Sequence, residues 1–285
     1  MDLHLSSPLR RLRAAASVTV LALAAAGVSP ASAVSADLLS SRDAASFARM
    51  ARSISGPVGV AVSPLGRDRR VETLGSLRSA GAWSTSKVPV AMAVGAAGRG
   101  RAQRQDLVQA ITASDNAAAE RLWRSLGSGR AAAGAADAQL RAAGDRRTRM
   151  ESRRLRAGFT PFGQTTWTLA DQARFTAGMS CTSAGRQVLD LMGQVVAGQR
   201  WGLGAAGDDA QIKGGWGPGV LPGINSGYLD RQMGVVTVQG RPLAVTLASL
   251  PGDGSHETGL RNLTRLARWV VSHVDARRIG AQPRC

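Results

Sequence analysis

The order of apolar and polar positions places strand patterns at both ends of the chain and helical patterns in its middle. Residues 58–62 and 71–77 are two short apolar runs joined by a polar, glycine-bearing turn, which predicts two strands. Strand patterns return at residues 211–216, 228–238 and 243–250. The intervening residues 101–203 are rich in alanine and arginine and are interrupted by glycine-bearing breaks, which predicts several helices.

A helix is predicted at each end of this pattern. Apolar residues recur at near-helical spacing over residues 35–54 and again over residues 257–274. This order suits one antiparallel sheet built from both ends of the chain, flanked by the terminal helices, with a helical subdomain at about residues 101–205 inserted. The expected fold class is therefore α/β (α+β).

The first 33 residues have the features of a secretory signal peptide. Arg10, Arg11 and Arg13 precede a short apolar stretch, and Ala31-Ser32-Ala33 supplies a small-residue cleavage signal. The stretch is short for a membrane span, although an uncleaved N-terminal anchor is an alternative. We therefore expect a secreted protein of the extracytoplasmic cell-wall space, with residues 34–285 as a single domain and no membrane span after signal removal.

The chain contains two cysteines, Cys181 and Cys285. Export would place them in a compartment that permits disulfides, so we expect them to pair, with two free thiols as the alternative. A disulfide closing a loop of this length contributes roughly 4–5 kcal/mol in the chain-entropy model. The predicted bond would fix the C-terminus to the helical region.

The formal net charge is +17, which favours loose binding to anionic polymers such as those of a cell wall. The arginines are scattered along the sequence, and aromatic residues make up only 4% of it. Nucleic-acid recognition usually needs a localised basic patch with stacking aromatic residues, so nucleic-acid binding is disfavoured.

Lysine is confined to two positions, Lys87 and Lys213, in a chain where Lys and Arg together number 36. Lys87 ends the segment Ser84-Thr85-Ser86-Lys87, an S-x-x-K motif that runs into an apolar helical pattern. A buried lysine can lose its proton, whereas a guanidinium cannot. A lysine one helical turn after a serine can therefore take the proton of that hydroxyl and activate it as a nucleophile.

Two further motifs follow in order. Ser114-Asp115-Asn116 is an S-D-N tripeptide, and Lys213-Gly214-Gly215 is a K-x-G motif. The ordered set S-x-x-K, S-D-N and K-x-G is typical of serine enzymes that react with penicillins. Over roughly residues 54–274 the chain resembles the class A β-lactamase family. The resemblance implies that Ser84 is the acylated nucleophile and Lys87 its activating lysine.

The resemblance also assigns the remaining candidate site residues. Ser114 would relay a proton to the leaving group, and Asn116 would hold the lysine and the substrate. Lys213 would stabilise the site and attract a substrate carboxylate, with Gly215 completing its motif. The oxyanion hole would be the backbone N–H groups of Ser84 and Trp216. The implied activity is hydrolysis of a lactam or amide through an acyl-enzyme, on a β-lactam or a cell-wall peptide.

Three departures from the family pattern bear on this assignment. The interval from Ser84 to Ser114 is about half the usual one, and Gly214 replaces a threonine or serine. Glu151 lies near the expected position of the glutamate that activates the hydrolytic water, but its sequence context is strongly basic and lacks the accompanying asparagine. Glu151 is therefore either the deacylation base or a surface residue paired with arginine.

Other catalytic classes lack their motifs. The sequence has no G-x-S-x-G elbow, no H-E-x-x-H and no C-x-x-C, so we expect no metal and no cofactor. His256 is interpreted as a structural residue at a helix start. Two alternatives to a β-lactamase remain: a DD-peptidase-like penicillin-binding protein with slow deacylation, and a catalytically silent wall-binding relative. We expect a monomer in each case.

Overall fold

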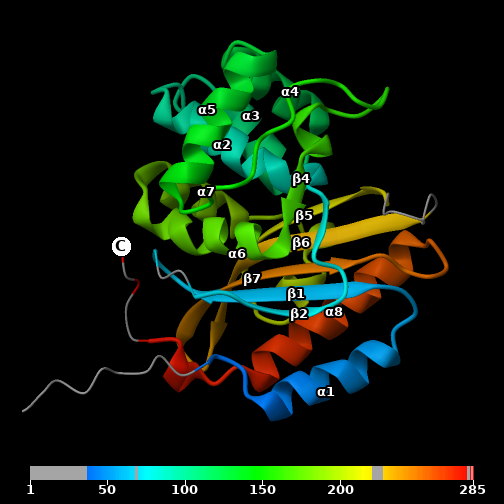
Figure 1. The fold of residues 1–285 in the computed structure, drawn as a ribbon. Helices are drawn as coiled ribbons and strands as arrows, with labels where there is room; N and C mark the ends of the chain where they lie inside the picture. Colours follow the sequence, from blue (N-terminus) through cyan, green and yellow to red (C-terminus); the bar gives the residue numbers. More distant parts are fainter. Residues whose placement is uncertain (1–36, 68–69, 220–226, 281–282, 284) are drawn as a thin grey trace, which may run out of the picture. The chain divides into compact units, whose positions relative to one another are not determined.

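A five-stranded antiparallel sheet forms the centre of the computed structural model, which describes residues 37–67, 70–219, 227–280, 283 and 285. The order across the sheet is β2-β1-β7-β6-β5, so the two N-terminal strands lie beside three C-terminal ones (Figure 1). The strands are β1 (Val58–Pro64), β2 (Glu72–Gly75), β5 (Gln211–Pro218), β6 (Tyr228–Val238) and β7 (Arg241–Ser249). The predicted sheet built from both ends of the chain is confirmed. The predicted signal segment lies outside the described residues.

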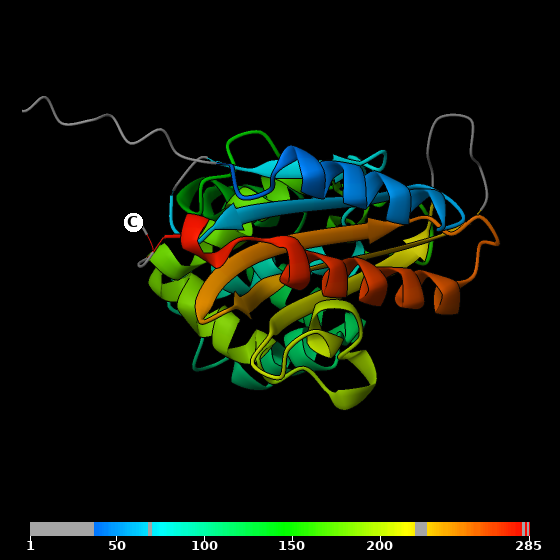
Figure 2. The same ribbon diagram turned by 90° about the horizontal axis from the view of Figure 1, so that it is seen from below.

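The two terminal helices, α1 (Ser41–Arg52) and α8 (His256–His273), cover one face of this sheet (Figure 2). Helix α1 begins six residues later than the predicted position 35, because Ser40 caps it by accepting a hydrogen bond from the Asp43 backbone N–H. The apolar stripe of α8 packs against the sheet, and the ring of Trp269 meets Phe47 of α1 edge-on at 5.0 Å.

The other face of the sheet carries helix α6 (Leu169–Gly178), above which lies the group of helices in the upper part of Figure 1. The group comprises α2 (Lys87–Ala96), α3 (Arg104–Thr112), α4 (Asn116–Ser125), α5 (Gly129–Ala142) and α7 (Ser183–Met192). Helix α2 runs through its middle and is buried from Lys87 to Val94. Small buried residues such as Ala132 and Ala136 on α5 allow close approach of the neighbouring helices.

A second, two-stranded sheet was not predicted from the sequence. Strands β3 (Ser79–Gly81) and β4 (Thr166–Thr168) pair antiparallel and have three residues each. Such short strands cannot display the alternation that identifies longer ones. The remaining helical turns are short 3₁₀ segments: η1 (Trp83–Ser86), η2 (Phe162–Gln164), η3 (Met179–Cys181), η4 (Ala197–Gln199), η5 (Gly202–Ala205) and η6 (Ala276–Arg278).

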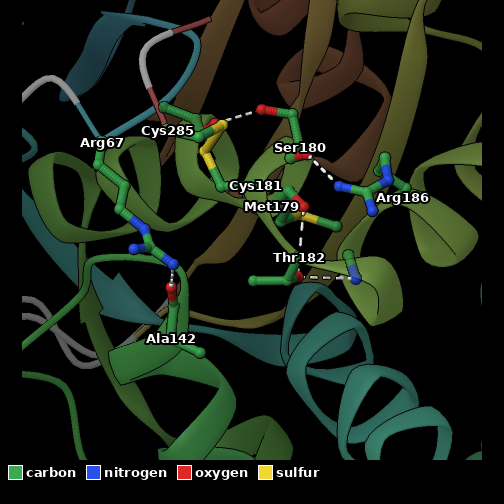
Figure 3. The surroundings of a disulfide bond; sticks show 10 residues. Arg67, Ala142, Met179, Ser180, Cys181, Thr182, Arg186 and Cys285 are labelled. Atoms are coloured by element: carbon green, nitrogen blue, oxygen red, sulfur yellow. Dashed lines mark hydrogen bonds between the residues drawn. A yellow bond between two sulfur atoms is a disulfide. The ribbon is translucent and has the colours of Figure 1, made fainter.

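Cys181 and Cys285 form the predicted disulfide, shown in Figure 3. Their Cα atoms are 5.3 Å apart, a normal separation for a disulfide. The bond attaches the last residue of the chain to η3, directly before α7. Among the described residues, no helix combines the length and the apolar character needed to cross a membrane.

Candidate active site

Ser84 lies in the 3₁₀ turn η1, immediately before α2. It lines a pocket of about 250 Å³ together with Ser114, Asn116 and Trp216. The edge strand β5 approaches this turn so closely that a Cβ on Gly215 would lie 2.9 Å from the backbone nitrogens of both Ser84 and Thr85. A glycine is therefore required at position 215, and its absent side chain allows the Ser84 backbone to lie against β5.

A buried hydrogen-bond network supports the turn from beneath. The guanidinium of Arg231 donates to the carbonyl oxygens of Ala80 and Gly81, and also to the Gln172 side-chain oxygen at 2.6 Å. Gln172 in turn donates from Nε2 to the Thr85 hydroxyl at 2.9 Å. These hydrogen bonds hold Thr85, the residue next to Ser84, in place. This network could not be predicted from the sequence, because nothing in an isolated arginine or glutamine marks it as buried.

Lys87 is the first residue of α2, and only 1% of it is exposed. Its Nζ donates to Asn116 Oδ1 at 2.7 Å, to the Ser114 carbonyl oxygen at 2.5 Å and to Ser114 Oγ at 3.3 Å. Burial lowers the pKa of Lys87 from 10.5 to about 7, while the negative charge of Asp115 opposes this effect. A substantial fraction of this amine is therefore neutral near pH 7.

The S-D-N tripeptide forms the connection between α3 and α4. Asp115 caps α4 by accepting a hydrogen bond from the Ala118 backbone N–H at 2.6 Å. Ser114 has a positive φ of 60°, an uncommon conformation for a residue other than glycine. The cap and this turn direct Ser114 and Asn116 toward Lys87, as the hydrogen bonds of its amine show.

Lys213 approaches Ser114 from β5. Its Nζ, which is fully buried, donates to Ser114 Oγ at 2.8 Å and to the Gly214 carbonyl oxygen at 2.8 Å. Burial lowers the pKa of Lys213 well below its usual value, and the charge of Lys87 lowers it further. The Ser114 hydroxyl thus lies between the amines of the only two lysines in the chain.

Gly214 is explained by its neighbour Trp201. A Cβ on Gly214 would lie 2.6 Å from the Trp201 ring, because that ring fills the space beside β5. The side chain of a threonine or serine at this position would therefore collide with the tryptophan. The departure of this motif from the family pattern follows from the packing of Trp201, which the sequence analysis did not foresee.

Aromatic side chains form much of the pocket wall. Trp83, Phe159, Trp216 and Tyr228 all line it, in a chain that contains only eleven Phe, Trp and Tyr residues. The rings of Trp83 and Phe159 are 5.2 Å apart. Sequence reasoning did not assign Phe159 or Tyr228 to the site, although four aromatic residues in one pocket make it suitable for a substrate with flat or apolar groups.

His256 and Asp230 lie behind this wall. The His256 ring packs 5.5 Å from the ring of Trp216 and 5.2 Å from that of Tyr228, and its Nδ1 lies 2.5 Å from Asp230 Oδ1. Burial raises the pKa of Asp230 to about 6, although the charge of His256 opposes this. His256 thus packs against both Trp216 and Tyr228, as expected if its role is structural.

The structure does not bring Glu151 into the Ser84 pocket. Glu151 lines a different hollow, together with Arg147, Arg149 and Asp171. Its carboxylate accepts a hydrogen bond from the Arg153 backbone N–H at 2.8 Å and lies 3.5 Å from the Arg153 guanidinium. These contacts are those of the surface ion pair weighed as the alternative. None of the described residues that line the Ser84 pocket is a carboxylate.

The described part of the chain also contains no group of three or more His, Cys, Asp and Glu side chains that could hold a metal ion. The hydroxyl-bearing residues Ser84 and Ser114 line the pocket, and the amines of Lys87 and Lys213 lie beside it, next to Ser114 Oγ.

Comparisons with solved structures show the fold to which this site belongs. The class A β-lactamase from Mycobacterium abscessus matches with a TM-score of 0.61 and 16% identity, over 81% of this chain and 98% of that one. An ancestral class A β-lactamase of Gram-negative bacteria matches with a TM-score of 0.59 and 21% identity, over 81% and 99% of the two chains. A β-lactamase from Xanthomonas campestris matches with a TM-score of 0.59 and 18% identity, over 81% and 97%.

These matches confirm the predicted resemblance at the level of the fold, which is that of the class A β-lactamases. No protein-family model matches the sequence, and no curated protein matches it either. At these identities the likeness establishes the architecture, and the activity has to be argued from the residues of the site.

Proposed function

We propose that this protein is a serine hydrolase that forms an acyl-enzyme at Ser84 with a lactam or amide carbonyl. The observation that carries the proposal is the burial of Lys87, whose lowered pKa leaves a neutral amine one helical turn after Ser84. The Lys87 amine lies 3.3 Å from the hydroxyl oxygen of Ser114, and Ser84 and Ser114 line the same pocket, which is large enough for a small substrate.

In the acylation step, Lys87 takes the proton of the Ser84 hydroxyl as the oxygen attacks the substrate carbonyl. The negative charge that develops on the carbonyl oxygen is stabilised by the backbone N–H groups of Ser84 and Trp216. The close packing of Gly215 against the Ser84 backbone supports this assignment, because it brings β5 beside the turn that carries Ser84.

Ser114 completes acylation by giving its proton to the leaving nitrogen. Its oxygen accepts a hydrogen bond from Lys213 at 2.8 Å, so its own hydrogen is available for donation. Either neighbouring amine can then return a proton to Ser114. Asn116 holds Lys87 through its side-chain oxygen, and Lys213, when protonated, attracts a substrate carboxylate.

Release of the acyl group is the step for which the pocket is least equipped. Glu151 lines another hollow and is engaged with Arg153, so none of the described residues that line the pocket supplies a carboxylate to activate a water. This observation favours the second candidate function, a DD-peptidase-like penicillin-binding protein whose acyl-enzyme is long-lived. Rapid β-lactam hydrolysis would require another base.

We further propose that the protein is exported to the cell-wall space and acts there as a monomer on a β-lactam or a cell-wall peptide. The disulfide between Cys181 and Cys285 supports export, because such bonds persist in oxidising compartments. The small volume of the Ser84 pocket supports a small-molecule or short-peptide substrate.

Intact-mass analysis of the protein during incubation with a penicillin tests the proposal. We expect a mass increase equal to one penicillin that persists for many minutes, absent from Ser84→Ala. A transient adduct with rapid penicillin consumption would favour a β-lactamase. Complete absence of an adduct, also with an active-site phosphonate, would favour the catalytically silent relative and reject the acyl-enzyme.

Glu151→Gln provides the matched control for deacylation. Because Glu151 lies outside the Ser84 pocket, we expect the adduct of this variant to decay at the wild-type rate, within about twofold. A clear lengthening of the adduct lifetime would restore Glu151 as the deacylation base.

A further inference from the structure

Three neighbouring hollows lie on the surface formed by Gly66 and Arg67, the end of α5, the following loop and α6. The first, of about 290 Å³, shares Gly144, Arg146 and Arg174 with the second, of about 210 Å³. The second shares Arg147 and Asp171 with the third, of about 600 Å³. The shared residues make the three hollows immediate neighbours, which together form a groove-like surface.

The residues that dominate this groove are arginines, and we call it the arginine groove. Its arginines are Arg67, Arg141, Arg146, Arg147, Arg149 and Arg174. Two carboxylates line it, Asp171 and Glu151. No residue of the groove lines the Ser84 pocket, so the groove is separate from the proposed catalytic site.

The carboxylates of the groove do not neutralise its arginines. Asp171 is shared by Arg147, at 2.8 Å, and Arg174, at 3.0 Å. The carboxylate of Glu151 is held by Arg153. A third carboxylate, that of Asp145, is fully buried behind the groove, where it lies 3.7 Å from Arg141 and accepts a hydrogen bond from Trp167.

Several guanidinium groups consequently retain free donors. Arg146 is exposed and makes no hydrogen bond or ion pair with any residue that the structure describes. Arg149 donates only to the adjacent Thr148 carbonyl oxygen, at 3.2 Å. Arg67 makes one long hydrogen bond, of 3.4 Å, to the Ala142 carbonyl oxygen, as Figure 3 shows. Each guanidinium carries five N–H donors, so most of these donors face solvent.

The shape and chemistry of the groove indicate the class of ligand. A series of hollows suits an extended chain, and guanidinium groups bind phosphate through paired hydrogen bonds. None of the described residues that line the groove is aromatic, so it offers no surface on which bases could stack. We propose that the arginine groove binds a linear polymer of phosphodiester-linked units without bases, such as a poly(polyol phosphate).

This proposal gives a location to the loose affinity for anionic polymers that the charge of +17 predicts. General attraction by net charge would involve all exposed arginines about equally. Binding in the groove instead makes the arginines at positions 146 and 149 matter far more than exposed arginines elsewhere. The two cases can therefore be separated with variants of equal charge.

The test is fluorescence anisotropy of a labelled poly(glycerol phosphate) with the full chain at several salt concentrations. The groove variant is Arg146→Gln with Arg149→Gln. The matched control is Arg99→Gln with Arg130→Gln, two exposed arginines on other surfaces that remove the same charge. We expect the Kd of the groove variant to rise about tenfold, with a shallower salt dependence, and that of the control to change by less than about twofold.

Equal weakening in both double variants, or no binding by the wild type, would overturn the proposal. A single-stranded DNA of similar charge is the second probe. Equally tight binding of this DNA, with the same sensitivity to the groove variant, would overturn the assignment to a polymer without bases. All four arginines have exposed side chains, so both variants should fold. Penicillin adduct formation at Ser84 reports independently on the catalytic site.

Discussion

Replacing Lys87 by methionine is expected to abolish acylation and, at the same time, to stabilise the protein. Lys87 is 1% exposed, and its burial lowers its pKa from 10.5 to about 7. Below pH 7 the folded protein must hold a charged amine in a site that disfavours charge. A pKa depression of this size corresponds to roughly 4–5 kcal/mol of destabilisation at and below neutral pH.

The hydrogen bonds of the amine offset part of this cost. Methionine has a similar length and an unbranched, adaptable side chain, so it can fill the space. It leaves the Ser114 carbonyl oxygen and Asn116 Oδ1 without the donor that Lys87 supplies, and each unmade bond costs about 1 kcal/mol. The net gain for Lys87→Met near pH 6.5 is therefore about 2–3 kcal/mol.

The gain should depend on pH in a defined direction. The unfolded chain binds a proton at this lysine up to its ordinary pKa of 10.5, whereas the folded protein loses that proton at about 7. Wild-type stability attributable to Lys87 therefore rises as pH increases from 7 to 10.5. The unfolding free energy of Lys87→Met relative to the wild type should therefore fall by about 3 kcal/mol between about pH 6.5 and about pH 9.5.

Urea unfolding of both proteins at these two pH values measures the difference. Labelling with a fluorescent penicillin verifies the loss of acylation, with Ser84→Ala as the inactive control. A variant that is less stable than the wild type at both pH values would refute the reasoning. A stability difference that does not change with pH would also refute it, because it would mean that folding does not lower the pKa of Lys87.

Three other outcomes follow from the site and the disulfide. The acylation rate of the wild type should rise with pH through about 7 as Lys87 loses its proton, measured by stopped-flow labelling; a flat profile would contradict the role of the amine. Gly214→Thr should cost about 1–3 kcal/mol in urea unfolding, because its Cβ would lie 2.6 Å from the Trp201 ring, and the same substitution should cost less in a chain that already carries Trp201→Ala. Cys181→Ala with Cys285→Ala should lower the unfolding free energy by roughly 4 kcal/mol, whereas an unchanged denaturation midpoint would mean that the bond constrains little.

The sequence was sufficient to predict the sheet and the three motifs. Strands β5, β6 and β7 carry clear apolar runs between turn residues, so their positions could be read from the pattern. The motif lysines stand out because arginine replaces lysine everywhere else in the chain. The composition therefore indicated that Lys87 and Lys213 stand at positions where arginine cannot take the place of lysine.

The residues that shape the pocket could not be predicted in this way. Trp201 and Gly214 are 13 positions apart and meet only because η5 folds back beside β5. Arg231 resembles the many surface arginines, yet it is fully buried and bonded to Gln172. Both the Trp201–Gly214 contact and the burial of Arg231 depend on segments that are far apart in the sequence. The local pattern of apolar and polar residues reports only on neighbours along the chain.

The expectation for Glu151 came from its spacing after the second motif, compared with the family that the chain resembles, and spacing does not determine which way a loop residue faces. The loop after α5 bonds its backbone to side chains at two points: the Met150 N–H donates to Asp137, and the Glu151 N–H donates to the buried Thr165. These bonds fix the loop with the Glu151 carboxylate beside Arg153, in the third hollow of the arginine groove.

The ionisable side chains of the site equip it differently for the two steps of the proposed reaction, acylation of Ser84 and hydrolysis of the acyl-enzyme. Acylation needs a base for Ser84 and a donor for the leaving group, and Lys87, Lys213 and Ser114 supply both within one hydrogen-bonded cluster. Hydrolysis needs a base for water, yet Asp115, whose negative charge acts on Lys87, is occupied as the cap of α4. A site whose described residues offer amines for the first step and no free carboxylate for the second should acylate faster than it deacylates. The lifetime of the Ser84 adduct is therefore the quantity that distinguishes a penicillin-binding protein from a β-lactamase in this chain.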